Sequence, residues 1–136
     1  MDREPAHVQE PGKPGIGATV LLVDDEDSVL YVVRRLMERE GFKVCTATDG
    51  RKAVDMFQAA KDDIRVVVLD LNMPGMDGEA VYREIVRIKP GVSVILTSGY
   101  AGDSVAGQFE PGEIAGFIQK PYQAHMLIGM VRDALA

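Results

Sequence analysis

The alternation of short apolar runs with amphipathic stretches is the feature that most constrains how this chain can fold. Three runs rich in β-branched residues, each followed by a polar or acidic residue, are Val20–Val23, Val66–Leu69 and Val94–Leu96. Continuous apolar runs of this kind are typical of strands buried on both faces of a parallel sheet. Lys43–Ala47 and Gly116–Gln119 are two weaker strand segments. The pattern therefore predicts five strands.

Apolar residues at helical spacing fill most of the gaps between these runs. The sets are Val29, Val32, Val33 and Leu36 on one face of a helix capped by Gly41, then Ala53, Val54 and Phe57, then Val81, Ile85 and Ile88, and last Leu127, Val131, Ala134 and Leu135. Residues 101–113 hold three glycines and a proline, which predicts an irregular fourth helix. Such alternation implies right-handed crossovers and a three-layer α/β sandwich. We expect a flavodoxin-like (βα)5 fold with a parallel sheet of order 2-1-3-4-5.

The composition is that of one globular domain, and it disfavours several functions. The 136 residues are 46% hydrophobic and 26% charged, which is ordinary for a folded domain. Fifteen Lys and Arg against 21 Asp and Glu give a formal net charge of −6, which disfavours direct binding of nucleic acid. No run approaches the roughly 18 apolar residues of a membrane-spanning helix, so we expect no direct membrane partner.

The first 17 residues differ from the rest of the chain. They contain three prolines and three glycines and show no hydrophobic period, which predicts a flexible tail or linker at 1–17 and an ordered domain at 18–136. Cys45 is the single cysteine and cannot form an internal disulfide, which fits the reducing conditions of the cytoplasm. On the second predicted strand, Cys45 is most simply a buried small residue.

Chemistry-bearing side chains follow the predicted strands at their carboxyl ends. Strand one ends in Asp24 and Asp25, strand three in Asp70, strand four in Thr97 and Ser98, and strand five in Lys120. An aspartate in such a place is, by itself, more often a helix cap, but side chains at four strand ends converge where an open parallel sheet binds ligands. Three neighbouring carboxylates repel one another, so a lysine and a hard divalent cation such as Mg²⁺ are needed to offset them. A carboxylate nucleophile, a cation, a lysine and a hydroxyl are the parts of a phosphoryl-transfer site.

The ordered part of the chain resembles the receiver domain of two-component response regulators. The segments that carry the resemblance are LLVDDED, VVLDLNMPGMDG, ILTSGY and GFIQKPY. By this resemblance, Asp70 is the phosphoacceptor. Asp24, Asp25, Asp70 and the backbone carbonyl of Asn72 would hold Mg²⁺, with Asp24 positioning a metal-bound water.

The resemblance also implies roles for the residues around this centre. Ser98 matches the switch hydroxyl better than Thr97, because Gly99 then occupies the small-residue position. Phe117, three residues before Lys120, matches the switch aromatic. The remaining matches are Lys120 to the lysine that pairs with a phosphoryl oxygen, Pro121 to a proline held in a cis peptide, and Asn72 and Tyr100 to positions that tune hydrolysis.

The function implied by the resemblance is that of a phosphoacceptor signalling domain rather than a turnover enzyme. Asp70 would take a phosphoryl group from a phosphohistidine on a sensor histidine kinase or a histidine phosphotransfer domain. Ser98 and Phe117 would then move and repack the surface of the last helices and strand. The sequence makes no prediction of an oligomeric state.

Three other functions fit the fold less well. A phosphatase of the haloacid-dehalogenase type would use Asp70 as nucleophile, but it normally has a second aspartate as general acid where this chain has Asn72. A flavodoxin-like cofactor binder would need a phosphate loop rich in Ser, Thr and Gly where DDEDS stands. A degenerate receiver would use the fold only for binding.

The context of the domain has two readings. It is either a stand-alone regulator or the terminal receiver of a hybrid histidine kinase. The tail rich in proline and glycine, together with ILTSGY and GFIQKPY, resembles the second.

Overall fold

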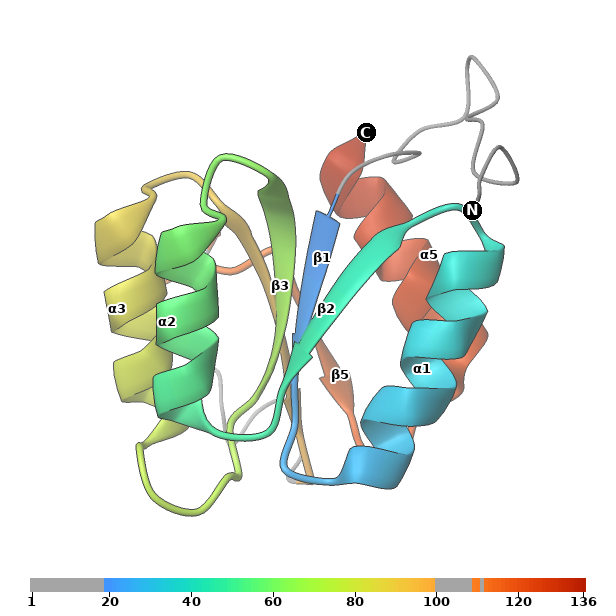
Figure 1. The fold of residues 1–136 in the computed structure, drawn as a ribbon, viewed down its shortest axis with the longest axis horizontal. Helices are drawn as coiled ribbons and strands as arrows, with labels where there is room; N and C mark the ends of the chain where they lie inside the picture. The colour runs from blue at the N-terminus through green and yellow to red at the C-terminus, as the bar shows by residue number, and fades with distance from the viewer. Residues whose placement is uncertain (1–18, 100–108, 111) are drawn as a thin grey trace.

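A parallel sheet with helices on both faces makes up the computed structural model, which describes residues 19–99, 109–110 and 112–136 (Figure 1). The strands in these ranges are β1 (Thr19–Val23), β2 (Lys43–Ala47), β3 (Ile64–Asp70), β4 (Ser93–Ser98) and β5 (Gly116–Gln119). They lie in the order β2-β1-β3-β4-β5. The predicted flavodoxin-like sandwich and its strand order are confirmed.

The described helices are α1 (Asp27–Arg39), α2 (Gly50–Ala59), α3 (Gly78–Ile88) and α5 (Ala124–Leu135). None of them is long and apolar enough to cross a bilayer. The irregular helix predicted at 101–113 falls largely outside the described residues, as does the tail predicted at 1–17.

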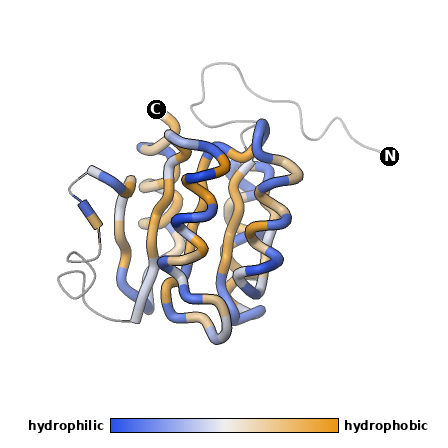
Figure 2. Tube along the Cα trace, turned by 90° about the vertical axis from the view of Figure 1, so that its left-hand side faces the viewer, coloured by the Kyte–Doolittle hydropathy of each residue, from blue (hydrophilic) through white to orange (hydrophobic). Residues whose placement is uncertain are grey.

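The two helical layers bury opposite faces of the sheet. Helices α2 and α3 cover one face, and α1 and α5 cover the other (Figure 1). Neighbouring residues of β3 alternate between the two cores, with Leu69 among the side chains under α2 and α3 and Val68 among those under α1 and α5. Figure 2 shows hydrophobic residues along the strands and alternating hydropathy along the helices. The sheet is therefore apolar on both sides, as the continuous runs predict.

Short polar signals set where the helices begin and end. Asp49 accepts a hydrogen bond from the Lys52 N–H at the start of α2. After α1, Gly41 has φ +97° and its N–H donates to Glu38, while the Phe42 N–H donates to Met37. These two bonds form a Schellman motif, so Gly41 ends the helix as predicted.

Two predictions of burial were wrong. Val32 is 52% exposed, and the buried stripe of α1 is Leu30, Val33 and Met37. Val32 lies about 100° around the helix from Val33, which turns it away from the sheet. Cys45 is half-buried rather than buried, because β2 is the edge strand and its neighbours cover it incompletely.

The segment before β5 is fastened to α3. The Tyr82 hydroxyl donates to the Glu113 carbonyl over 2.9 Å, and the Tyr82 and Phe109 rings meet edge to face at 5.0 Å between centroids. Arg83 pairs with the Glu113 carboxylate and lies over the Phe109 ring. These contacts hold the described residues at 109–113 against the α3 layer.

Candidate functional site

Three carboxylates meet where β1 and β3 end. The two strands are neighbours, with Val23 opposite Leu69, so Asp24 and Asp70 emerge side by side. One carboxylate oxygen from each of Asp24, Asp25 and Asp70 lies within 4.8 Å of the others. Asp24 and Asp70 are 5% and 1% exposed, while Asp25 faces solvent. A set of oxygen donors with excess negative charge and one open side fits a hard divalent cation.

The Lys120 ammonium group places a positive charge beside this cluster. Its Nζ lies 3.1 Å from Asp24 Oδ2, 3.2 Å from Asp70 Oδ2 and 2.9 Å from Glu26 Oε1. The position of Lys120 is fixed from the backbone, because its N–H donates to the Ser98 carbonyl over 2.7 Å and so extends the β4–β5 pairing. The Lys120–Pro121 peptide is cis.

The pKa values of Asp24 and Lys120 are both raised, but for different reasons. Burial raises the pKa of Asp24, and the hydrogen bonds from the Glu26 N–H and Lys120 only partly offset that rise. Burial alone would lower the pKa of Lys120, but its hydrogen bonds to Glu26 and Asp24 and the charges of Asp24 and Asp70 outweigh burial and raise it. Lys120 therefore stays protonated, while Asp24 resists ionisation beside Asp70.

The loop after β3 reaches across to the end of β4. The Asn72 N–H donates to Asp70 Oδ1 over 2.9 Å, and the Asn72 side chain turns towards the next strand. Its Oδ1 accepts from Ser98 Oγ at 2.7 Å and from the Gly99 N–H at 3.0 Å. Ser98 is 1% exposed. Of the two hydroxyls at this strand end, it is that of Ser98 that contacts the loop after Asp70.

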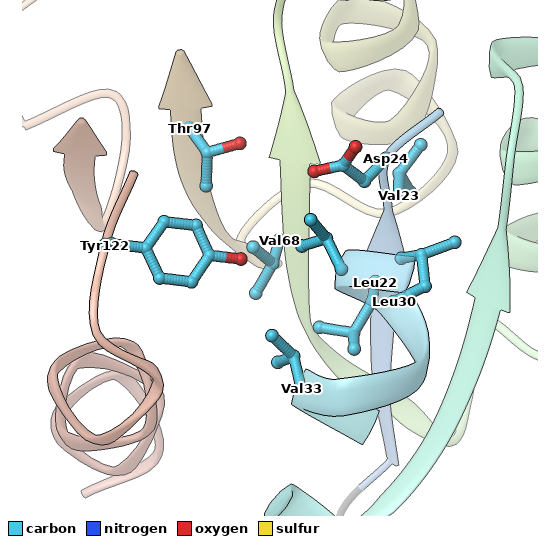
Figure 3. A pocket seen from close by; sticks show the side chains of 9 residues that line it. Leu22, Val23, Asp24, Leu30, Val33, Val68, Thr97 and Tyr122 are labelled. Carbon is cyan, nitrogen blue, oxygen red and sulfur yellow. The ribbon is translucent and has the colours of Figure 1, made fainter. Parts of the chain in front are cut away.

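Thr97 lies on the other face of β4. It lines a narrow cavity under α1 together with Asp24 and Tyr122, and its hydroxyl is directed towards Asp24 (Figure 3). Burial and the Asp24 charge raise the pKa of Tyr122 to about 12. The Thr97 and Tyr122 side chains thus pack beneath the acidic cluster rather than beside its open side.

The remaining predicted residues lie around this centre. Phe117 is half-buried, packs against the core under α2 and α3, and lies opposite Leu96 in the sheet. Tyr100 falls outside the described residues.

Two contacts of the site were not predicted. One is Glu26 as a partner of Lys120, although its acidic neighbours in DDED are the signal that could have identified it. The other is the bond from Ser98 to the Asn72 side chain, for which the sequence carries no signal because it depends on the path of the loop.

The surface over the cluster has two adjoining hollows. Asp25, Glu26, Asp70, Asn72, Gly99 and Lys120 line the first. The second is a groove between α1 and the β5–α5 connection, lined in part by Val29, Val32 and Pro121. Glu26 and Lys120 border both hollows, so the apolar groove leads to the carboxylates.

Comparison with known proteins adds to this geometry. Sensor kinase CckA of Brucella abortus is 35% identical over 118 residues, which cover 87% of this chain and 12% of that kinase. Chemotaxis protein CheY of Thermotoga maritima is 30% identical over 114 residues, or 83% of this chain and 93% of CheY. This chain therefore spans a small part of the first relative and nearly all of the second.

The same likeness holds in three dimensions. A chain of the CheX–CheY–BeF3–Mg complex from Borrelia burgdorferi superposes with a TM-score of 0.81 and 28% sequence identity, covering 90% of this chain and 92% of that one. A family model described as the response regulator receiver domain matches residues 20–132. With the acidic cluster and Lys120 at the carboxyl ends of a 2-1-3-4-5 sheet, the chain belongs to the response regulator receiver domains of two-component signalling.

Proposed function

We propose that Asp70 is the phosphoacceptor of this receiver domain. The observation that carries the proposal is the environment of its carboxylate: buried at the end of β3, paired with Lys120 Nζ at 3.2 Å, and at the base of a hollow open to solvent. A partner's phosphohistidine can enter that hollow from outside. The haloacid-dehalogenase alternative is not favoured, because the carboxamide of Asn72 cannot supply the proton of a general acid.

The transfer is a displacement at phosphorus. An Asp70 oxygen forms the new P–O bond as the P–N bond to the imidazole breaks, and the imidazole nitrogen keeps the electron pair of that bond. Lys120 pairs with a phosphoryl oxygen, and Ser98 donates to another. These donors stabilise the spreading negative charge in the transition state.

Receiver domains bind Mg²⁺ at an acidic cluster of this kind, and Asp24, Asp25 and Asp70 form the cluster here. We propose that Asp25, Asp70 and the Asn72 carbonyl would ligate the ion directly, and that Asp24 would hold one of its waters. The ion supplies positive charge to the equatorial phosphoryl oxygens. The switch would involve Ser98, which ends β4 beside Asp70, and Phe117, which lies in β5, the strand that leads to Lys120.

Labelling by a small phosphodonor tests the role of Asp70. In acetyl phosphate and Mg²⁺, the parent chain should gain the mass of one phosphoryl group, and hydroxylamine should remove it because the bond is an acyl phosphate. Asp70→Asn should gain none. Asp62→Asn removes an exposed charge before the other end of β3 and should label like the parent. Full labelling of Asp70→Asn, measured by intact mass spectrometry, would falsify the assignment.

We further propose that a helix of the histidine kinase or phosphotransfer partner packs in the groove beside α1. Val32 is 52% exposed there, and the groove adjoins the hollow over Asp70 through Glu26 and Lys120. An exposed apolar patch bordered by polar residues is typical of protein recognition sites.

Docking can be separated from the chemical step by comparing two phosphodonors, a phosphorylated partner protein and acetyl phosphate. Val32→Asp should slow phosphoryl transfer from a phosphorylated partner protein by tenfold or more, on the order expected for an apolar anchor. Its labelling by acetyl phosphate should equal that of the parent, because Val32 does not touch Asp70. Arg39→Asp changes an exposed residue at the far end of the same helix and is the matched control. Equal transfer rates for all three chains would refute the proposal that the partner docks in this groove.

A further inference from the structure

The Asn72 side chain occupies two hydrogen-bond donors at the edge of the phosphoacceptor site. Its Oδ1 lies 2.7 Å from Ser98 Oγ and 3.0 Å from the Gly99 backbone nitrogen. A backbone N–H can only donate, so the atom that meets it is the carboxamide oxygen and not the nitrogen. Because that oxygen only accepts, the Ser98 hydroxyl must donate its proton to it.

This arrangement leaves the Ser98 proton committed. A serine hydroxyl has one proton and can donate one full hydrogen bond. While it donates to Asn72, it cannot also donate to a phosphoryl oxygen. Asn72, Gly99 and Asp70 line the same hollow, so a phosphoryl group on Asp70 would compete with the carboxamide for the same donors.

We propose that the Asn72 carboxamide is a placeholder acceptor that stands in for a phosphoryl oxygen in the resting domain. It keeps Ser98 and Gly99 satisfied and oriented, and it must release them when Asp70 is phosphorylated. A phosphoryl group can displace it because charged acceptors form hydrogen bonds roughly twice as strong as neutral ones. Asn72 is thus a positioning residue for the switch, and this inference rests on the proposed role of Asp70.

The competition between the Asn72 carboxamide and a phosphoryl group can be measured as the affinity of the domain for a phosphoryl mimic. Beryllofluoride with saturating Mg²⁺ is titrated into the full chain, and its equilibrium constant is unaffected by hydrolysis. Asn72→Ala removes the competing acceptor and should bind about fivefold more tightly than the parent, the equivalent of one net hydrogen bond. Asn72→Asp keeps an acceptor oxygen and adds charge, so it should bind more weakly.

A double-mutant cycle with Ser98→Ala distinguishes this role from a general effect of the loop. Without the Ser98 hydroxyl, the gain from Asn72→Ala should shrink, because one of the two competing bonds is already absent. In the unliganded protein, the Gly99 amide proton should exchange faster with solvent in Asn72→Ala. The free energy of unfolding should fall modestly, because the buried Ser98 hydroxyl loses this acceptor.

The outcomes separate this inference from the proposed function. A parent chain that binds beryllofluoride, with Asn72→Ala of equal or weaker affinity, would overturn the placeholder and leave Asp70 as phosphoacceptor. An unchanged gain in the Ser98→Ala background would also overturn it. A parent chain that binds no beryllofluoride would overturn the proposed function and the placeholder together.

Discussion

Lys120 partly neutralises the carboxylates at the ends of β1 and β3. Its partners are unequal, since Asp24 and Asp70 are buried whereas Glu26 is 56% exposed. An ion pair that includes an exposed carboxylate contributes little to stability, because water already solvates the charge. The contacts with the two buried carboxylates matter more, because neither has an alternative cation within the described residues.

Removal of Lys120 should therefore lower the free energy of unfolding more than removal of its exposed partner, Glu26. We expect Lys120→Met to lower the free energy of unfolding by about 1–3 kcal/mol at neutral pH without divalent cations, because two buried carboxylates are left to repel each other. Glu26→Gln should change it by less than about 0.5 kcal/mol. Urea unfolding compares the two variants, and equal losses would contradict this ranking.

The pH dependence of Lys120→Met has a defined sign. Burial already raises the pKa of Asp24, and loss of the lysine raises it further. The folded state then binds a proton more tightly than the unfolded state, so stability rises as the pH falls towards the raised pKa of Asp24. We expect the deficit of the variant to shrink on mild acidification, measured by urea unfolding at several pH values. A deficit that grows on acidification would contradict the assignment to carboxylate repulsion.

At the scale of elements, the strands were more predictable than the faces of the helices. The apolar runs located β1, β3 and β4 to within two residues at each end, because a strand buried on both faces leaves a continuous apolar signal. The buried face of α1 was misassigned at Val32, since several apolar residues on one helix allow more than one stripe. The attachment of Phe109 and Glu113 to α3 uses the Glu113 carbonyl, which leaves no trace in the sequence.

The candidate site likewise has residues that the sequence predicts and contacts that it does not. Asp24, Asp70 and Lys120 were predictable because strand ends of a parallel sheet must converge. The bonds of Asn72 to Ser98 and Gly99 were not, because they depend on how the loop after β3 turns.

That loop passes close to the start of α3, and Gly78 permits the approach. A Cβ on Gly78 would lie 2.6 Å from the Leu71 Cα and 2.9 Å from its carbonyl oxygen, which are backbone atoms. Gly78→Ala should therefore lower the free energy of unfolding by about 1–3 kcal/mol. Gly129→Ala, in the interior of α5 with nothing within 4 Å of its Cβ, should raise it by about 0.5–1 kcal/mol. Denaturant midpoints with unchanged slopes would report both, and a stabilised Gly78→Ala would contradict the close approach.

At the scale of the whole molecule, the acidic cluster ties ion binding to global stability. Its carboxylates lie at the carboxyl ends of two neighbouring strands, β1 and β3, so they are brought together only in the folded state. An ion that binds only the folded state stabilises it by about 2.7 kcal/mol at a hundredfold excess over its Kd.

We therefore expect Mg²⁺ to raise the melting temperature of the parent chain and of Asp62→Asn by the same amount. Asp25→Asn should show little or no rise, because it loses a ligand from the proposed site without disturbing the core. Differential scanning calorimetry at constant ionic strength makes the comparison. Equal shifts in Asp25→Asn and the parent would mean that the ion acts elsewhere on the acidic surface.

The wide separation of the site residues along the chain also has a consequence during synthesis. Lys120 lies 96 positions after Asp24 and 50 positions after Asp70. At roughly 5–20 residues per second, a ribosome needs roughly 3–10 seconds to reach Lys120 after it has added Asp70. Throughout that interval the growing polypeptide has its acidic residues but neither their lysine nor the β5 strand that positions it. An unfinished copy therefore lacks the lysine that the proposed transfer to Asp70 uses.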